Sequence, residues 1–274
     1  GGRTDCISLE AVTYIKINNL KLWRPTIVGA DCGVNETETH FEFNNVVFDG
    51  SLDQNVQNHG DSVVIYNDCQ FLNAVDDGVS LHYNANVTLN RCLIQGNNQG
   101  VNNTLGTGAS FTANYCSFLN NIADTVNLSG FAPTFNGCLF RTTYNAAGIK
   151  TDVGVNFNNC IFDTSKASAD SAAIFSHNSP GGTAEFKNCT FYGGESAYGT
   201  INSAVAGGVI NLTNCILYKI YRCAYISAGT VNANYCIFNG LDVKNLTSNT
   251  NEITSNPLLI DPANGNYRIP SNSP

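Results

Sequence analysis

Nine residues, NFNNCIFDT at 156–164, return with small changes along almost the whole chain of 274 residues. In each copy a central position, here called the anchor, lies between apolar residues and is cysteine in eight of ten copies. Successive anchors are 21 to 29 residues apart, and most steps are 22 to 24 residues. Repetition at this period predicts a solenoid, in which each repeat packs against its neighbours. The anchors are Leu20, Val46, Cys69, Cys92, Cys116, Cys138, Cys160, Cys189, Cys215 and Cys236.

The spacing of apolar residues around the anchor predicts strands. They stand at anchor −5, −3, 0 and +2, as Val155, Phe157, Cys160 and Phe162 do. Alternation by two on each side, with a slip of one residue between, indicates two short strands joined by a sharp bend. Asparagine occupies anchor −2 in eight of ten copies. Because asparagine tolerates the left-handed backbone conformation, we expect it to form that bend.

A third strand precedes each pair. The segments that indicate it are DCISLE (5–10), DGVSLHY (77–83), DTVNL (124–128) and CAYIS (223–227). Three short strands per repeat predict an all-β fold, a single-stranded parallel β-helix of about 10–11 coils with internal Cys, Phe and Leu ladders. We expect one domain over residues 1–274.

The anchor cysteines are predicted to pack as small hydrophobic residues, since leucine and valine replace cysteine at two anchors. Disulfides between neighbouring coils are a poorer alternative, because parallel Cβ vectors fit the required dihedral badly. A metal site would need convergent ligands, whereas a ladder presents a line. The state of Cys6, Cys32 and Cys223, which lie outside the ladder, stays open.

Composition excludes some classes of partner. A net charge of −8 argues against a nucleic-acid surface, and no apolar run is long enough to span a membrane. The chain contains no methionine, and Gly1-Gly2 is typical of a processed or engineered start.

The N-x-C-x-F coils resemble the right-handed parallel β-helix repeats of the pectate-lyase-like superfamily. The closing NPLLIDPANGNYRIPSNSP, residues 256–274, resembles an end segment found on many secreted bacterial β-helix proteins, and we expect 255–274 to be such a segment. The resemblance implies a right-handed helix that meets an extended polysaccharide or cell-surface glycan, and a place outside the cell, on its surface or on a virion. The superfamily includes lyases, hydrolases, phage tailspikes and adhesins, so the fold does not choose among them.

The best candidate for an active site is Asp76-Asp77, which resembles the aspartate pair of polygalacturonase-type hydrolases. Paired carboxylates can divide acid and base duties. The other motifs of that family, Asn-Thr-Asp, Gly-His-Gly and Arg-Ile-Lys, are absent. A lyase would need a basic residue beside calcium ligands. Calcium is therefore the one ion that the resemblance suggests, and no other cofactor is expected. The basic residues in the middle of the chain that we consider are Arg91, Arg141 and Lys150.

Alignment of neighbouring coils extends the candidate site. Without gaps it places Asp53 opposite Asp76, and His59 opposite His82. Acid and histidine together could perform general acid–base chemistry or hold a cation. Asp77 also has a structural interpretation, because aspartate recurs just before the first strand of a coil, where it would accept backbone N–H bonds. The recurring residues are Asp5, Asp31, Asp77, Asp124 and Asp170.

Two classes of function follow. The protein binds or processes a polysaccharide, or it is a non-catalytic structural or adhesive module. Exposed aromatic residues would favour sugar binding. The alternation of inward and outward positions along the strands predicts that six face outward: Trp23, Tyr83, Tyr115, Tyr192, Tyr218 and Tyr235. The side chains of the first coil are apolar, and leaving them in water would be unfavourable. We therefore expect this coil to be covered, in a homo-oligomer or by end-to-end stacking.

Overall fold

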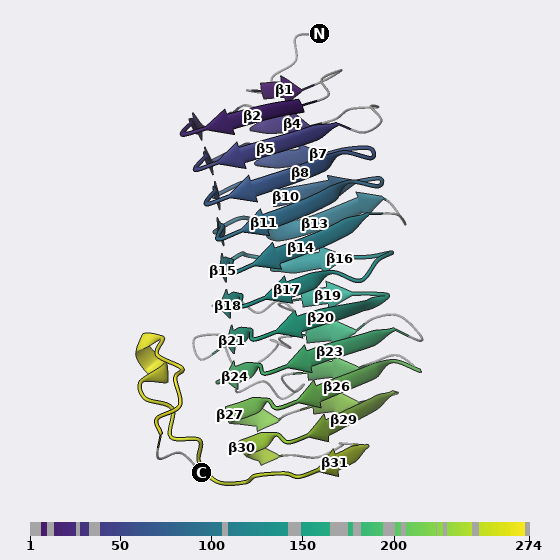
Figure 1. Cartoon of the computed structure of the whole chain (residues 1–274), viewed down its shortest axis with the longest axis vertical. Coiled ribbons are helices and arrows are strands. Elements are labelled where there is room, and N and C mark those ends of the chain that lie inside the picture. Colours follow the sequence, from purple (N-terminus) through teal and green to yellow (C-terminus); the bar gives the residue numbers. More distant parts are fainter. Residues whose placement is uncertain are drawn as a thin grey trace. The chain divides into compact units, whose positions relative to one another are not determined.

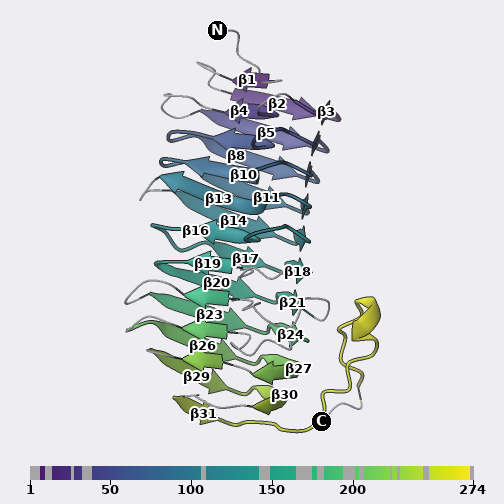
Figure 2. The same ribbon diagram turned by 180° about the vertical axis from the view of Figure 1, so that it is seen from behind.

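The computed structural model describes residues 7–9, 14–25, 28–32, 39–105, 109–141, 149–164, 175–177, 182–193, 201–203, 207–222, 224–226, 229–242 and 247–271. The chain divides into two compact units, Gly1–Thr134 and Phe135–Pro274. Each unit is a parallel β-solenoid with three sheets, here called A, B and C in the order in which a coil visits them. Figure 1 and, from behind, Figure 2 show the strands stacked coil upon coil. The prediction of a parallel β-helix is therefore confirmed, while that of a single domain stays a prediction.

In unit 1 each strand pairs with the corresponding strand of the next coil. Sheet A contains β1 (Ile7–Leu9), β4 (Ala30–Cys32), β7 (Val56–Asn58), β10 (Asp77–His82), β13 (Gln99–Leu105) and β16 (Val126–Leu128). Sheet B contains β2 (Tyr14–Asn18), β5 (His40–Asn44), β8 (Val63–Asn67), β11 (Asn86–Asn90) and β14 (Ser110–Asn114). Sheet C contains β3 (Lys21–Trp23), β6 (Val47–Asp49), β9 (Gln70–Leu72), β12 (Leu93–Gln95) and β15 (Ser117–Leu119).

Unit 2 repeats this arrangement. Its part of sheet A contains β19 (Ile149–Thr151), β22 (Phe175–His177), β25 (Ile201–Ser203) and β28 (Ala224–Ile226). Sheet B contains β17 (Thr134–Asn136), β20 (Gly154–Asn158), β23 (Thr183–Lys187), β26 (Val209–Thr213), β29 (Thr230–Asn234) and β31 (Ser248–Thr250). Sheet C contains β18 (Leu139–Arg141), β21 (Ile161–Asp163), β24 (Thr190–Tyr192), β27 (Ile216–Arg222) and β30 (Ile237–Asp242).

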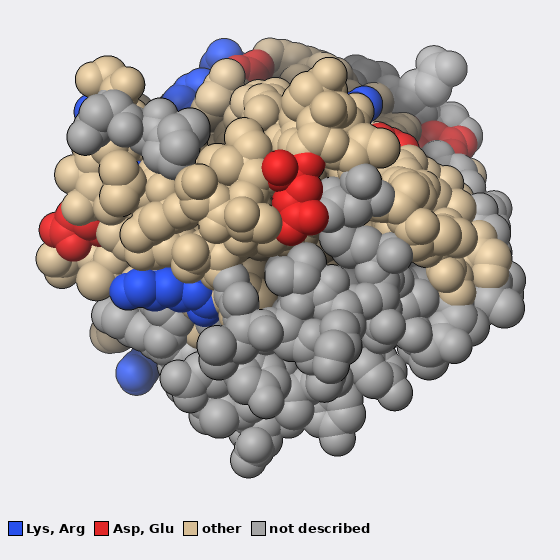
Figure 3. Space-filling view, turned by 90° about the horizontal axis from the view of Figure 1, so that it is seen from below, with Lys and Arg blue, Asp and Glu red and all other residues tan. Residues whose placement is uncertain are grey.

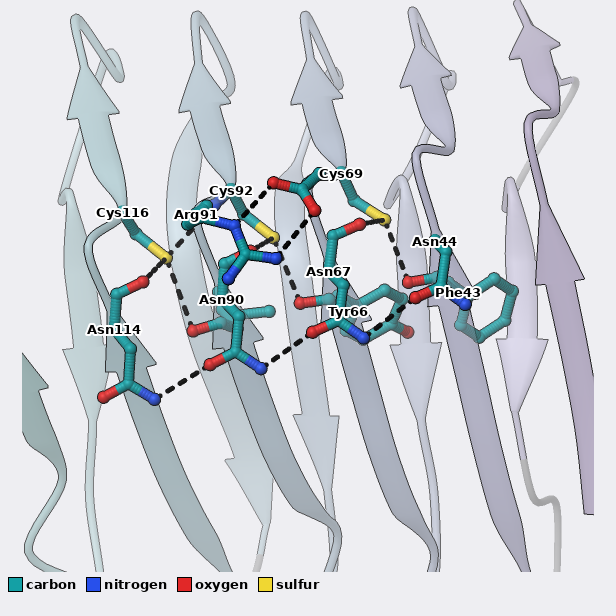
Figure 4. Close-up of polar contacts among 12 residues, drawn as sticks. Phe43, Asn44, Tyr66, Asn67, Cys69, Asn90, Arg91, Cys92, Asn114 and Cys116 are labelled. Atoms are coloured by element: carbon teal, nitrogen blue, oxygen red, sulfur yellow. Dashed lines mark hydrogen bonds and ion pairs between the residues drawn. The ribbon is translucent and has the colours of Figure 1, made fainter.

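The anchor cysteines form the predicted ladder inside the coils. All eight are buried and free, as is Cys32. Each thiol packs at the bend between sheets B and C and lies near backbone carbonyl oxygens; the Cys69 Sγ donates to the carbonyl oxygen of Phe43 at 3.4 Å (Figure 4). The cysteines therefore contribute to the core, as predicted. Cys6 and Cys223 lie outside the described residues.

The bend differs from the prediction in one respect. The positive φ angles occur at anchor −1, at residues as different as Asn45, Arg91 and Tyr115, and not at the asparagine-rich position −2. The asparagines at −2 form a ladder of side-chain hydrogen bonds instead. In unit 1 Asn44 donates to Asn18 at 3.0 Å. Asn67 donates to Asn44, Asn90 to Asn67 and Asn114 to Asn90, each at 2.9 Å (Figure 4). Asparagine recurs because one amide both donates and accepts, which a stack of identical coils requires.

Aromatic ladders fill the rest of the core. In unit 2 the Phe157 ring stacks on Phe135 at a centroid distance of 5.0 Å and on Phe186 at 4.8 Å. A second stack on sheet C joins Phe162 to Phe140 and Phe191, at 5.0 and 4.7 Å. Rings from neighbouring coils thus meet at a distance that favours aromatic pairs.

The first coil is more exposed than those that follow. The side chain of the anchor Leu20 is 36% exposed, whereas the next anchor, Val46, is fully buried. Tyr14 on β2 is 54% exposed. Association through this coil stays a prediction.

Beyond β31 the chain leaves the coils and runs back along sheet C of unit 2, drawn yellow in Figures 1 and 2. This end segment contains one 3-10 helix, Pro262–Asn264. Its Leu259 and Tyr267 side chains pack with Tyr192. The Tyr267 hydroxyl donates to Asp163 Oδ2 at 2.5 Å, and Arg141 Nε donates to the same oxygen at 2.8 Å. The segment is therefore fixed by a buried aromatic contact and a charged hydrogen-bond network.

Candidate functional site

The five predicted site residues lie on sheet A of unit 1, at the two ends of β7 and β10. Val56 pairs with Val79 and Asn58 with Leu81, which places His59 beside His82. Asp53 and Asp76 precede these strands on the same two coils. The coil alignment made from the sequence is confirmed by this register.

At the amino-terminal ends of the strands, Asp53 and Asp76 lie side by side. The Asp76 N–H donates to the Asp53 carbonyl oxygen at 3.1 Å. Partial burial, followed by the neighbouring Asp76 carboxylate, raises the pKa of Asp53. The two side chains are half-buried, so both remain within reach of a solute.

Asp77 is in a different environment, with only 1% of its surface exposed. Its Oδ2 accepts a hydrogen bond from Asn102 Nδ2 at 3.2 Å, and the nearby Ser80 side chain also lowers the pKa of the carboxyl. Its Oδ1 has no hydrogen-bond partner among the described residues. The prediction that Asp77 caps the turn through backbone N–H groups is therefore wrong, because side chains are the partners found. Asp5 and Asp170 lie outside the described residues.

The pKa of Asp77 follows from this burial. Desolvation, with the Asp76 carboxylate second, raises it from an ordinary 3.8 to about 7, although the hydrogen bonds from Asn102 and Ser80 oppose the rise. An unpaired carboxyl oxygen in a buried place favours the neutral acid. Below about pH 7 Asp77 is therefore mainly in the protonated form.

Close packing behind Asp77 explains the glycine that follows it. A Cβ on Gly78 would lie 2.7 Å from both Asn97 Nδ2 and the Gly100 carbonyl oxygen. Asn97 is fully buried and bonds to Asn55 and Asn121 in the neighbouring coils. An inner asparagine ladder thus supports the start of β10 and holds the Asp77 backbone in place.

At the other end of β10 the two histidines form a stacked pair. Their ring centroids are 4.5 Å apart with an interplanar angle of 16°. Burial lowers the pKa of both rings, and for His82 the neighbouring His59 adds to the effect and the pKa falls to about 4. Both imidazoles are therefore neutral near pH 7 and can accept or donate a proton.

A polar track connects the two ends of the strand. His82 Nε2 lies 3.1 Å from Ser80 Oγ, and Ser80 is close enough to Asp77 to influence the pKa of its carboxyl. On the other side, His59 Nε2 lies 3.3 Å from Asp31 Oδ1 on β4. The sequence analysis did not identify Ser80 and Asn102. Both are at outward-facing positions of sheet A, in register with Asp31 on β4. Alignment of these coils with the coil of Asp31 would have identified them.

The surroundings of the track are partly apolar. Leu52 and Val75, which precede the acid pair, are each 63% exposed, and Tyr83, which follows His82, is 55% exposed. Apolar and aromatic surface next to polar groups suits the mixed faces of sugar rings.

Other predicted features lie elsewhere. Trp23, Tyr115 and Tyr235 are exposed, as parity predicted. Tyr192 is only 5% exposed, because the end segment covers it, so that prediction is wrong; Tyr218 is half-buried beside it. Of the basic residues, Arg91 forms an exposed ion pair with Asp68, and Arg141 is in the Tyr267 network. These contacts involve none of Asp53, Asp76 and Asp77.

Within the described residues, no group of three or more His, Cys, Asp or Glu side chains converges as metal ligands would. The same part of the chain contains no helix long and apolar enough to cross a membrane.

No protein-family model and no curated protein matches this sequence. Among solved structures, the chain is similar to the catalytic unit of a thermostable GH87 α-1,3-glucanase from Streptomyces thermodiastaticus, with 12% identity, a TM-score of 0.41, and coverage of 89% of this chain and 63% of that one. ORF18 of Geobacillus virus E2 matches with 14% identity and a TM-score of 0.38, over 92% of this chain and 55% of that one. QnrB1, a plasmid-mediated fluoroquinolone resistance protein, matches with 10% identity and a TM-score of 0.23, over 90% of this chain and 94% of that one. The chain thus spans less than two thirds of the first two proteins, and identities of 10% to 14% assign it to no family.

The environment of Asp77 predicts how stability depends on pH. Because its pKa is raised on folding, the native state binds the proton more tightly than the unfolded state, so its contribution falls as pH rises from about 4 to about 7. A shift from 3.8 to about 7 corresponds to about 4 kcal/mol. The lowered histidine pKa values act in the opposite direction, so the test compares wild type with Asp77→Asn.

We expect the difference in unfolding free energy, wild type minus Asp77→Asn, to fall by up to about 4 kcal/mol between pH 4 and pH 7. Urea denaturation at several pH values measures it. A difference that stays constant over this range would show that Asp77 titrates normally.

Proposed function

We propose that this protein binds an extended polysaccharide across sheet A of unit 1 and hydrolyses it with the Asp76-Asp77 pair. The observation that carries the proposal is the unequal environment of two adjacent carboxyls: Asp77 is buried with an unpaired oxygen, whereas Asp76 is half-buried beside Asp53. Neighbouring carboxyls in unlike environments can divide the acid and base roles that cleavage of a glycosidic bond requires.

The proposal gives each of these groups one role. Protonated Asp77 is the proton donor to the leaving oxygen, and Asp76 is the base that activates water. The Asp53 carboxyl lies beside Asp76 on the preceding coil, and the neutral His82 exchanges protons with Asp77 by way of Ser80. Leu52, Val75 and Tyr83 provide the sugar-facing surface. The place of action in this proposal is outside the cell, at its surface or on a virion, as the resemblance implies.

A second candidate is a non-catalytic adhesive or structural module. The observation that favours it is the 1% exposure of Asp77, which leaves substrate no direct contact with that carboxyl in the present conformation. In this case the carboxyl pair and the polar track contribute to architecture alone.

Replacing Asp76 by asparagine distinguishes the two. If the pair is catalytic, turnover in a reducing-sugar assay over a polysaccharide panel should fall at least about 100-fold, because the base is lost. The melting temperature should stay close to wild type, since the side chain is half-buried.

The matched control is Asp68→Asn, the same change at an exposed acid of unit 1 that pairs with Arg91. It should retain full turnover. Glycan binding without turnover in the wild type, unchanged in Asp76→Asn, would favour the adhesive module instead.

A further inference from the structure

A hollow of about 280 Å³ lies on sheet B of unit 2, and its lining includes none of the residues proposed for catalysis. It crosses β23, β26, β29 and β31. Its sides are two rows of outward side chains, and the backbone between the rows forms its floor, since Leu212 and Ala233 point inward and are buried. One row is Glu185, Asn211, Asn232 and Ser248, and the other is Thr213, Asn234 and Thr250.

The first row is held rigid by its own hydrogen bonds. Asn211 Nδ2 donates to Glu185 Oε1 at 2.6 Å, and Asn232 Nδ2 donates to Asn211 Oδ1 at 3.0 Å. Ser248 Oγ donates to Asn232 Oδ1 at 2.9 Å. In the second row Thr250 Oγ1 donates to Asn234 Oδ1 at 2.8 Å. These contacts fix the side chains before any ligand arrives, so little conformational entropy is lost on binding.

The rows still have bonding capacity to offer. An amide nitrogen carries two hydrogens and an amide oxygen accepts twice. The row uses one hydrogen of Asn211 and one of Asn232, which leaves a second N–H on each for a ligand. Across four strands, at a spacing of about 4.8 Å, this pattern of donors and acceptors extends over about 14 Å.

Charge defines the class of ligand. Glu185 is the one charged residue among those that line the hollow, and Lys187 Nζ lies 4.0 Å from its Oε2. Together they leave the groove without net charge. Figure 3 looks instead at the end of the molecule where β31 lies in Figure 1, and there both acidic and basic side chains lie among uncharged residues. A polyanion such as a polyuronate would therefore gain no electrostatic attraction from this surface.

A peptide also fits less well than a sugar chain. Peptide recognition relies on free strand edges or on pockets for apolar side chains. The strands β26 and β29 are each paired on both sides, and β31 is the last strand of sheet B and pairs with β29. The groove lies over the face of these strands, and its lining presents no outward apolar side chain. Hydroxyl groups, which donate and accept at short spacing, match amide, hydroxyl and carboxylate partners.

We propose that this groove, defined by the seven residues of the two rows, is a non-catalytic binding site for a neutral polysaccharide that runs across the strands of sheet B. It goes beyond the function proposed for sheet A, because it would hold a glycan whether or not Asp76 and Asp77 cleave one.

The test is affinity electrophoresis of the full chain in native gels, which detects weak binding to a polymer. Separate gels contain dextran, mixed-linkage β-glucan, galactomannan, polygalacturonate, or denatured casein as an extended polypeptide. The protein is made in bacteria, because Asn211 heads an Asn-Leu-Thr sequon. We expect at least one neutral polymer to retard the wild type, and polygalacturonate and casein to leave its mobility unchanged.

Asn232→Leu removes the amide at the centre of the groove with little change in size. Loss of its hydrogen bonds should raise the dissociation constant at least about 5-fold. The matched control is Asn86→Leu on β11 of unit 1, where the asparagine likewise faces outward and accepts a serine hydroxyl, from Ser110 at 2.7 Å. It should bind as the wild type does. Circular dichroism confirms that both variants fold.

Four outcomes would overturn the proposal. Equal retardation of wild type and Asn232→Leu would exclude the groove, as would the absence of retardation by every neutral polymer. Retardation by polygalacturonate or casein that Asn232→Leu abolishes would refute the ligand class. Retardation lost in Asp76→Asn but kept in Asn232→Leu would assign binding to sheet A, and would leave the function proposed there intact.

Discussion

Replacement of Phe157 by alanine is expected to lower the free energy of unfolding by about 3–5 kcal/mol. The ring is fully buried, stacks on Phe135 and Phe186, and meets Phe140 and Phe162 edge-on at 5.8 and 5.2 Å. Neighbouring coils hold these rings in place, so the structure cannot collapse into the space that the deletion leaves. Urea denaturation followed by circular dichroism measures the loss.

The control for Phe157 is Tyr235→Ala in the same unit, where the ring is 59% exposed. Its removal should change the unfolding free energy by less than about 0.5 kcal/mol. Similar losses in the two variants would mean that the aromatic ladder does not support the core.

The second large effect is expected at the cysteine ladder. Cys160 is fully buried, and its thiol donates to the carbonyl oxygens of Phe135 and Asn158, both at 3.4 Å. Cys160→Asp would bring a carboxylate beside carbonyl oxygens with no donor to pair it, which should cost at least about 3–5 kcal/mol at pH 7. The loss should be smaller at pH 4, where the new carboxyl can remain protonated.

Cys160→Val tests the same position without the charge. Valine already occupies the equivalent anchor at Val46, where it is fully buried. The loss in unfolding free energy should therefore stay below about 1.5 kcal/mol. If valine and aspartate were equally costly, the thiols would have a role that packing does not explain.

Repetition made the fold predictable, because each coil repeats the same pattern of inward positions. Cys160 and Phe162 face the core for the reason that the alternation of apolar residues implied. The bend was predicted one residue away from its true place, since asparagine is suited both to left-handed backbone and to side-chain ladders. Tyr192 was misplaced because its cover, the end segment around Tyr267, comes from outside the repeat.

The candidate site was predictable only where it depends on register. A step of 23 residues between coils places His82 over His59, and no side-chain detail is needed for that conclusion. The burial of Asp77 and its contacts with Ser80 and Asn102 depend on rotamers and on the next coil, which parity alone does not specify. The groove on sheet B was missed because amides such as Asn211 and Asn232 look like ordinary outward residues in a sequence rich in asparagine.

The pairing of each strand with its counterparts one coil before and after has an evolutionary consequence. In unit 1 Asn86 pairs with Val63 and with Ser110, so the coil of β11 meets its neighbours through the same register on both sides. Duplication or loss of one whole coil would restore every ladder, whereas insertion of a single residue within a strand would exchange its inner and outer faces. A gene for such a protein can therefore change in length by steps of one coil without a redesigned core. The asparagine, cysteine and phenylalanine ladders are the contacts through which each added copy would pack against its neighbours.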